Sequence, residues 1–262
     1  MVCCVVTTVV AAVVVLILTV KFIYHYQSGR CTSKTRLVGK TAIVTGASAG
    51  IGKETARDLA QRGARVILAC RNVEKAERVA EDIKKTTGNT DVVVREVDTS
   101  DLTSVRKFAE DILRTETALH ILVNNAGMSG MKKRKLTADG LEVTMATNHF
   151  GHFLLTNMLL DVTANSVHPG AVYTEIMWKG ETNLIKSIFA LLVWLMGKDE
   201  KLGAQTSIYL AVSEEVNNVT GKYYVDCKDT KVSAAAKDAG LAKKLWEASE
   251  QLVKLRPEER HY

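Results

Sequence analysis

The chain has 262 residues, 47% of them hydrophobic, and a formal net charge of +6. This length suits one α/β domain of ordinary size with enough apolar side chains for a core, and no internal repeat or low-complexity linker is visible. No nucleic-acid motif accompanies the positive charge. The five cysteines lack C-x-x-C spacing and indicate neither a disulfide framework nor a zinc site; they are Cys3, Cys4, Cys31, Cys70 and Cys227.

The N-terminal segment is the first predicted element. Residues 2–20 carry no charge, and only three threonines interrupt their apolar run. At a rise of 1.5 Å per residue, about 19 residues nearly cross a bilayer core of roughly 30 Å. We predict a membrane anchor at 1–21, a basic juxtamembrane linker at 22–39 and one domain at 40–262. A cleaved signal peptide is the alternative, but its basic n-region and small-x-small cleavage site are not evident.

Positive charge follows the anchor with no acidic residue before position 40. Because positive flanks stay on the cytoplasmic side, the domain is expected to face the cytosol. In a lumenal domain, residues 218–220 (Asn-Val-Thr) would instead form a glycosylation acceptor. A second basic cluster at 132–135 suits an anionic lipid surface, or is a solvated loop. The basic residues after the anchor are Lys21, Arg30, Lys34, Arg36 and Lys40.

Short β-branched runs then alternate with longer amphipathic runs. The alternation predicts a doubly wound, Rossmann-like parallel sheet with helices on both faces, and a ligand crevice at the carboxyl ends of its strands. Strands are expected at 41–44, 65–69, 91–97, 121–124, 162–167 and 223–225. Helices are expected from residue 51 and at 73–87, 102–113, 141–160, 204–212 and 241–255. The apolar run 188–196 is too short to span a bilayer and is a buried helix or a lid over a lipophilic substrate.

A glycine-rich turn, 45–52 (TGASAGIG), follows the first strand and begins a helix. Glycine lets backbone amides approach a phosphate closely, and the helix directs its partially positive end at that anion. The spacing alone is a weak signal, and a tight turn without a ligand is the alternative. Its position between a strand and a helix, with Asn124-Asn125-Ala126-Gly127 two βα units later, predicts a dinucleotide site.

Five further segments carry a closer resemblance: 40–56 (KTAIVTGASAGIGKETA), 147–156 (TNHFGHFLLT), 166–176 (SVHPGAVYTEI), 221–227 (GKYYVDC) and 245–250 (LWEASE). Together they resemble the short-chain dehydrogenase/reductase family, and most closely the microsomal retinol dehydrogenases. The resemblance implies an oxidoreductase that uses NADP(H), is anchored by an N-terminal helix in the endoplasmic reticulum membrane, and acts on retinoids or other lipophilic aldehydes and alcohols.

The second strand ends in Ala69-Cys70-Arg71, where a binder of the ribose diol usually has Asp or Glu. Arg71 and Lys53 favour NADP(H) over NAD; a surface Arg71 without preference is the alternative. The resemblance implies that Asp98 contacts the adenine end and that residues 124–127 shape the floor below the cofactor. The expected cofactor-binding residues are Gly46, Ser48, Ala49, Gly50, Ile51, Gly52, Lys53, Arg71, Asp98, Asn125, Ala126, Gly127, Pro169, Gly170 and Thr174.

The family's catalytic segment has no counterpart in the sequence. The family uses a Ser on one strand and a Tyr-x3-Lys pair on one face of the following helix, where the lysine lowers the pKa of the phenol. In this chain the helix predicted at 141–160 is followed almost directly by the strand predicted at 162–167. A βα unit of roughly 30 residues or more, which the family has between these two elements, is therefore absent. Tyr224 and Lys228 have the spacing but fall in a predicted strand, about 13 Å apart. Of the catalytic set only Asn148 remains, and its family role is structural.

This loss leaves alternatives for fold and function. The strand at 162 moves beside the strand at 121 and closes the sheet, or an open slot with exposed apolar faces remains. The protein is an enzyme whose proton relay uses other residues, or a membrane-anchored NADP-binding remnant without turnover. A scaffold role through the basic loop at 132–135 is a third, weaker hypothesis. The absent helix belongs to the family's dimer interface, so no oligomeric state is predicted.

Overall fold

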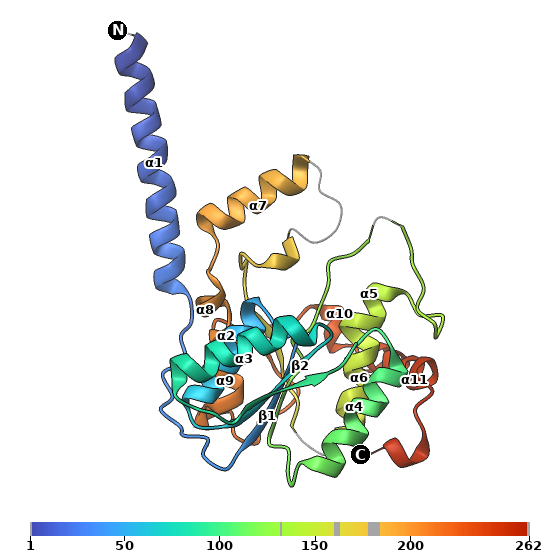
Figure 1. Cartoon of the computed structure of the whole chain (residues 1–262). Coiled ribbons are helices and arrows are strands. Elements are labelled where there is room, and N and C mark those ends of the chain that lie inside the picture. The colour runs from blue at the N-terminus through green and yellow to red at the C-terminus, as the bar shows by residue number, and fades with distance from the viewer. Residues whose placement is uncertain (1, 132, 160–162, 178–183, 261–262) are drawn as a thin grey trace.

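The computed structural model describes residues 2–131, 133–159, 163–177 and 184–260, and shows an α/β domain from which one long helix projects (Figure 1). That helix, α1, runs from Val2 to Gln27 and therefore continues six residues beyond the predicted anchor boundary at 21. Within Val5–Gln27, the most apolar window of 18 residues has a mean hydropathy of 2.6, and the protein does not bury this window. By length and composition, α1 is a candidate membrane span.

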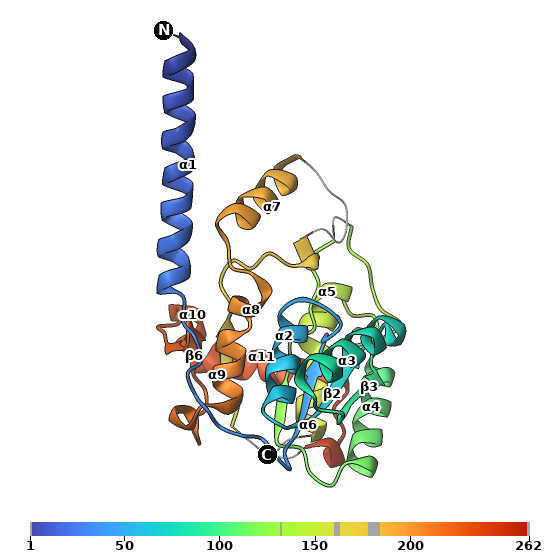
Figure 2. The ribbon, with the colours of Figure 1, turned by 60° about the vertical axis from the view of Figure 1, so that its left-hand side comes forward.

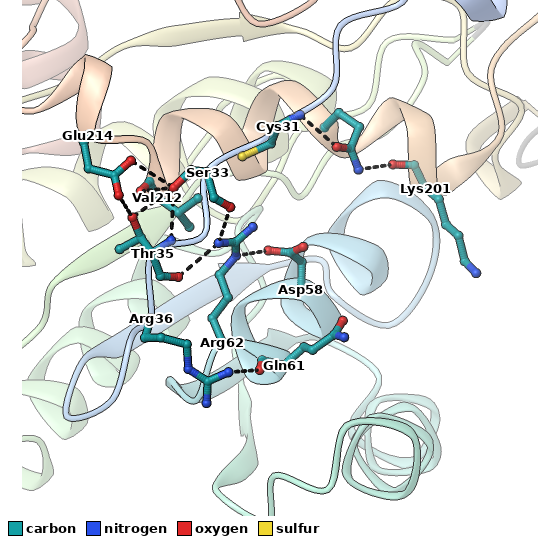
Figure 3. Close-up of polar contacts among 11 residues, drawn as sticks. Cys31, Ser33, Thr35, Arg36, Asp58, Gln61, Arg62, Lys201, Val212 and Glu214 are labelled. Atoms are coloured by element: carbon teal, nitrogen blue, oxygen red, sulfur yellow. Dashed lines mark hydrogen bonds and ion pairs between the residues drawn. The ribbon is translucent and has the colours of Figure 1, made fainter.

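The segment after α1 is bound to the domain, unlike a free linker (Figure 3). Arg62, at the end of α2 (Gly50–Gln61), donates to the carbonyl oxygens of Ser33 at 2.9 Å and Thr35 at 3.0 Å. The Cys31 amide donates to Gln205 Oε1 at 3.0 Å, and the Ser33 hydroxyl donates to Glu214 at 3.0 Å. The predicted linker at 22–39 thus consists of the last turns of α1 and an ordered strap across α2 and the helix that carries Gln205.

Four parallel strands form the main sheet in the order β3-β2-β1-β4. Along β1, Ala42 and Val44 face one hydrophobic core while Ile43 faces the other, as the period of two requires. Helices α2 and α3 cover the first face, and α4 and α6 cover the second. The strands are β1 Thr41–Thr45, β2 Arg65–Cys70, β3 Val92–Glu96 and β4 Ile121–Val123; the helices are α3 Val73–Thr87, α4 Leu102–Thr115 and α6 Gly151–Leu159.

A separate sheet of three strands follows in the order β5-β6-β7. β5 (Ser166–His168) pairs in parallel with β6 (Tyr223–Val225), and β6 pairs antiparallel with β7 (Lys228–Asp229). Among the described residues, β4 and β5 are both edge strands, so the sequence does not close the sheet by moving its next strand beside β4. Of the two alternatives, the described residues exclude the closed sheet, and β4 and β5 each keep one edge without a strand partner among them. The predicted strand 162–167 begins later than expected, and its first residue lies outside the described ranges.

The other predicted elements match the structure closely. The long helix expected at 141–160 is present as α5 (Val143–Met145), a π-helical turn at Ala146–Phe150 and α6, with residue 160 outside the described part. Helix α9 contacts both β4 and β5 and so bridges the two sheets. The remaining helices are α7 Leu184–Met196, α8 Glu200–Gly203, α9 Gln205–Val212, α10 Ala234–Lys237 and α11 Ala239–Val253.

Candidate cofactor-binding site

The glycine-rich turn joins β1 to α2 at the carboxyl edge of the main sheet. Gly46 and Gly50 have φ angles of +67° and +62°, which favour glycine. A Cβ on Gly52 would lie 2.3 Å from Asn125 Nδ2, so this position also needs glycine for close packing. Ala49 is the N-cap of α2 and makes no side-chain hydrogen bond to it. The first amides of α2 therefore keep their donors for an anion, which fits the pyrophosphate of a dinucleotide.

Thr45 fixes the turn against the next loop of the sheet edge. Its Oγ1 accepts hydrogen bonds from the amides of Asn125 and Ala126, both at 2.9 Å, and lies 3.0 Å from His152 Nε2. With two bonds accepted, the hydroxyl can donate its proton to His152 Nε2, or to the Val123 carbonyl at the longer distance of 3.4 Å. Burial lowers the pKa of His152, which favours the neutral imidazole that accepts this bond. Sequence reasoning missed Thr45 and His152 because their contact joins residues 107 positions apart.

Other predicted residues of the turn have structural partners of their own. Ser48 hydrogen-bonds Cys70, and burial raises the pKa of that thiol. Ile51 is half-buried against the core shared by α2 and α3. Lys53 lies 3.1 Å from Asp82 on α3, a carboxylate that also binds Arg57 at 2.7 Å. Lys53 thus lies beside the site with its charge directed to α3. Of the two cations predicted to bind a 2′-phosphate, Lys53 and Arg71, only Arg71 is not bound to α3.

Arg71 and Asp98 face each other at the ends of β2 and β3. The guanidinium Nη1 lies 3.7 Å from Asp98 Oδ2, and 76% of the Arg71 side chain is exposed. Asp98 Oδ1 accepts from the amide of Ser100 at 2.9 Å and from its hydroxyl at 2.7 Å. Asp98 is not the cap of the following helix, because Asp101 is the N-cap of α4. An exposed cation with a fixed carboxylate below it can bind the adenosine end of a dinucleotide.

The loop after β5 reaches the same helix end from the other sheet. A Cβ on Gly50 would lie 3.5 Å from Thr174 Cγ2, which places Thr174 over the start of α2. Glu175 continues this loop and forms an ion pair with Lys75 of α3 at 2.6 Å. Pro169 and Gly170 lie earlier in this loop, directly after β5, where the Pro169 carbonyl accepts from Lys198 Nζ at 3.1 Å and Gly170 has a φ of +86°.

Glu200, the first residue of α8, is a site residue that the sequence did not indicate. Its Oε1 lies 3.7 Å from the position of a Cβ on Gly50, so a carboxylate borders the start of α2. Burial, and then the neighbouring charge of Glu54, raise the pKa of Glu200. Both effects disfavour its anionic form. A bound phosphate would add to this repulsion, so Glu200 is expected to make cofactor binding depend on pH.

The Asn125–Gly127 loop packs against the glycine turn, and Asn148 is bonded to the residue that follows this loop. Asn148 Oδ1 accepts from the Met128 amide at 2.9 Å, and its Nδ2 donates to the Met128 carbonyl at 3.0 Å. Gly127 packs against the same side chain, since its Cβ would lie 3.5 Å from Asn148 Oδ1. Asn148 therefore fixes the loop that borders the site, and both polar atoms of its amide are bonded to backbone.

The candidate Tyr-x3-Lys pair does not form a catalytic pair. Tyr224 is buried in β6, whereas Lys228 lies in β7 and pairs with Val225 across the hairpin. Ser166 is in β5, and its hydroxyl donates to the Lys222 carbonyl at 3.2 Å. Among the residues that the structure describes, no helix presents a tyrosine and a lysine on one face toward the glycine turn. The junction at 161–162 lies outside the described residues.

Comparison with known proteins identifies the relatives of this arrangement. The family model described as short chain dehydrogenase matches residues 40–165. Human retinol dehydrogenase 11 is 38% identical, with 87% of this chain and 90% of that protein covered. Mouse retinol dehydrogenase 11 is 36% identical over 301 positions, with 91% of this chain and 94% of that protein covered. A crystal structure of an uncharacterized protein from Mycobacterium paratuberculosis superposes with a TM-score of 0.63 at 30% identity, covering 87% of this chain and 98% of the other.

Proposed function

The chain belongs to the short-chain dehydrogenase family, and on that premise we propose that it is a membrane-anchored, NADP(H)-binding protein of the retinol dehydrogenase type whose hydride transfer is impaired. The observation that carries the binding half is the start of α2. There three glycines remove side chains, and the helix begins without a side-chain cap. These features suit a pyrophosphate better than a turn without a ligand.

NADPH, when bound, supplies a hydride for a carbonyl carbon. The residues of this chain would hold it: the amides that begin α2 bind the pyrophosphate, and Thr174 covers it from the second sheet. Arg71 lies where the ribose of the adenosine end is expected, and β2 ends in Ala69 and Cys70 without a carboxylate. A guanidinium there favours a 2′-phosphate over a free diol, which supports NADP(H) rather than NAD.

Hydride transfer is impaired because reduction of a carbonyl also needs a group that delivers a proton to the carbonyl oxygen. A phenol with a pKa of about 10 needs a neighbouring cation before it serves near neutral pH. Tyr224 and Lys228 are separated on two strands, and Asn148 is bound to Met128. The mouse alignment runs over 301 positions, more than the 262 residues of this chain, which supports an absent segment.

The substrate and the location are further parts of the proposal. The relatives are named for retinol, so a retinoid or another lipophilic alcohol or aldehyde is the proposed ligand class. An apolar helix as long as α1 would hold the protein in the membrane from which such a ligand is taken, with the endoplasmic reticulum as the proposed membrane. The basic residues after α1 support a domain on the cytosolic side.

A single-turnover assay tests both halves of the proposal. Detergent-purified protein is mixed with NADPH and all-trans-retinal, retinol is quantified, and NADPH binding is measured separately by fluorescence. Human retinol dehydrogenase 11 is the positive control, and Gly50→Asp, which places a side chain and a negative charge at the start of α2, is the negative control. We expect NADPH binding without retinol above the Gly50→Asp background. Retinol above that background would show another proton donor, and absence of NADPH binding would contradict the cofactor site.

A further inference from the structure

Helix α7 exposes large apolar side chains over most of its circumference. The segment Ser187–Met196 has no charged residue. Within this segment only Ala190 and Val193 are buried. The exposed side chains are Ile188 at 50%, Phe189 at 59%, Leu191 at 51%, Leu192 at 44% and Trp194 at 56%. A helix that lies on an aqueous surface usually has a polar outer face, whereas the segment Ser187–Met196 of α7 has no charged residue on its outer face.

The position of α7 beside α1 indicates what covers this face. α7 contacts α1 and lies on the side of the domain from which α1 projects, as both views show (Figures 1 and 2). At its end, His25 Nε2 of α1 donates to the Gly197 carbonyl at 3.0 Å. The two helices are therefore joined where the chain leaves α1.

The contact reaches into the uncharged part of α1. Ile17, Lys21 and the pair Tyr24–His25 are half-buried, whereas the residues between these positions are exposed, so one stripe of α1 is turned toward the domain. Ile17 precedes Lys21, the first charged residue, and so belongs to the segment that would lie in the bilayer. α7, which contacts α1, is accordingly near the level of the membrane surface.

We propose that α7 is an interfacial membrane helix: its outer face, Ile188 to Trp194, inserts into the same leaflet that α1 crosses on its way to the domain. The proposal rests on α1 as the anchor, and the occupant is lipid. Thirteen residues cannot span the hydrocarbon core, but an apolar helix lying in the plane of the interface needs no such length. Trp194 suits the interface, where amphipathic aromatic rings are enriched.

Fluorescence of Trp194 tests the depth of α7 in the full chain. The Trp178→Phe, Trp246→Phe variant, which leaves Trp194 alone, is reconstituted in phosphatidylcholine vesicles with and without brominated acyl chains. We expect brominated lipid to remove about half of the Trp194 emission. The matched chain that keeps Trp246 alone reports α11, on which 43% of Trp246 is exposed, and is expected to keep its emission. A Leu16→Trp variant lacking the native tryptophans reports whether α1 itself is inserted.

Quenching of Leu16→Trp without quenching of Trp194 would overturn the α7 proposal while leaving the anchor intact. A blue-shifted but unquenched Trp194 would indicate coverage by protein, such as a closed lid or a second copy, and would also overturn it. As a second variant, Leu191→Glu with Leu192→Glu in the Trp194 chain is expected to reduce quenching at least twofold. The control pair Leu241→Glu with Leu245→Glu, on exposed positions of α11, should leave it unchanged.

Discussion

Lys198 Nζ lies 2.5 Å from Asp226 Oδ1, and only 1% of the Lys198 side chain is exposed. The same carboxylate oxygen accepts the Gly29 amide at 2.9 Å. One carboxylate at the end of β6 therefore binds both the chain leaving α1 and the loop before α8. Lys198 also lies 5.8 Å from the ring centroid of Tyr24, so its charge faces the last turn of α1 as well.

The two partners are expected to differ in their contribution to the free energy of unfolding. Asp226→Ala leaves a buried ammonium without a counter-ion and is expected to cost about 3–5 kcal/mol. Lys198→Met leaves Asp226, of which 29% is exposed, in contact with water and is expected to cost less. Urea unfolding in detergent micelles, followed by near-UV circular dichroism, measures both. A cost for Lys198→Met equal to or above that of Asp226→Ala would contradict this assignment.

Thr45→Val removes the hydroxyl that binds the turn to the next loop. The Ala126 amide then loses its acceptor, at about 1–3 kcal/mol for an unsatisfied group, and the Asn125 amide keeps only its bond to the Val123 carbonyl at 3.0 Å. We expect lower stability together with weaker NADPH binding, because the loop beside the glycine turn loosens. Thr45→Ser keeps the hydroxyl and is the matched control. Thermal unfolding and NADPH titration test this, and normal binding in Thr45→Val would show that the loop is fixed by other contacts.

Arg71→Ala is expected to separate the two dinucleotides. Loss of a charge-assisted contact to the 2′-phosphate costs about 1.5–3 kcal/mol, or roughly 10- to 100-fold in NADPH affinity. Affinity for NADH should change little. Arg78→Ala, at an exposed position of α3 paired with Glu74, is the control for a general loss of positive charge. Equal loss for both cofactors, or none, would assign Arg71 to the surface alone.

Glu200 gives NADPH binding a pH dependence with a definite sign. Burial raises the pKa of this carboxyl, so it is neutral at low pH and becomes an anion beside the start of α2 as pH rises through its folded pKa. NADPH affinity should therefore fall as pH rises through that range. Glu200→Gln should remove this fall and bind more tightly at neutral pH, by on the order of 1 kcal/mol, or about fivefold. Affinity titrations across pH, with exposed Glu247→Gln as the control, check the sign.

The raised pKa of Glu200 also affects folding. An acid whose folded pKa exceeds its unfolded value stabilises the protein below the unfolded pKa, and this contribution is lost as pH rises through the folded pKa. The Glu200→Gln variant should consequently gain stability relative to the parent chain as pH rises from acidic to neutral. A constant difference across pH would mean that Glu200 titrates normally.

Asn218 reports the side of the membrane on which the domain lies. It is exposed in a turn with a φ of +60°, next to Thr220, whose hydroxyl accepts from the Ala164 amide at 3.0 Å. An exposed acceptor of this kind is open to glycosylation in the lumen, so we expect no glycan in a cytosol-facing domain. Treatment with an endoglycosidase after expression in mammalian cells is expected to leave the gel mobility unchanged. A mobility shift that Asn218→Gln abolishes would place the domain in the lumen.

Local patterns were sufficient to predict most elements. The helix 73–87 and the strand 223–225 have the predicted ends, because their apolar spacing is a local signal. In the structure Asn72 caps the start of that helix and Gly88 its end. The glycine turn likewise lies between a strand and a helix as expected. Residues that act through contacts between distant segments, such as His152 and Glu200, left no local signal. Whether the main sheet closes depends on whether β5 pairs with β4 or with β6. The relative energies of these two pairings depend on contacts between distant segments, which the sequence does not show locally.

The helix α1 ends beyond the predicted anchor boundary at 21 for a related reason. Loss of uniform hydropathy after Val20 indicated the end of the membrane segment, but helix geometry does not end where hydropathy does. Tyr24 and His25 contact the domain and keep the backbone helical to Gln27. The membrane boundary and the helix end are therefore separate positions, and the sequence pattern reports only the first.

Because α1 enters the domain without a flexible joint, its rotational phase is coupled to that of the domain. Each residue of an α-helix turns the chain by about 100°, so one alanine inserted between Lys21 and Tyr24 would rotate the membrane segment by that angle relative to the His25–Gly197 and Gly29–Asp226 contacts. An insertion of seven residues, close to two full turns, would nearly restore the phase while lengthening the helix. The rotational phase of α1 therefore determines which side of the domain faces the membrane that α1 would cross.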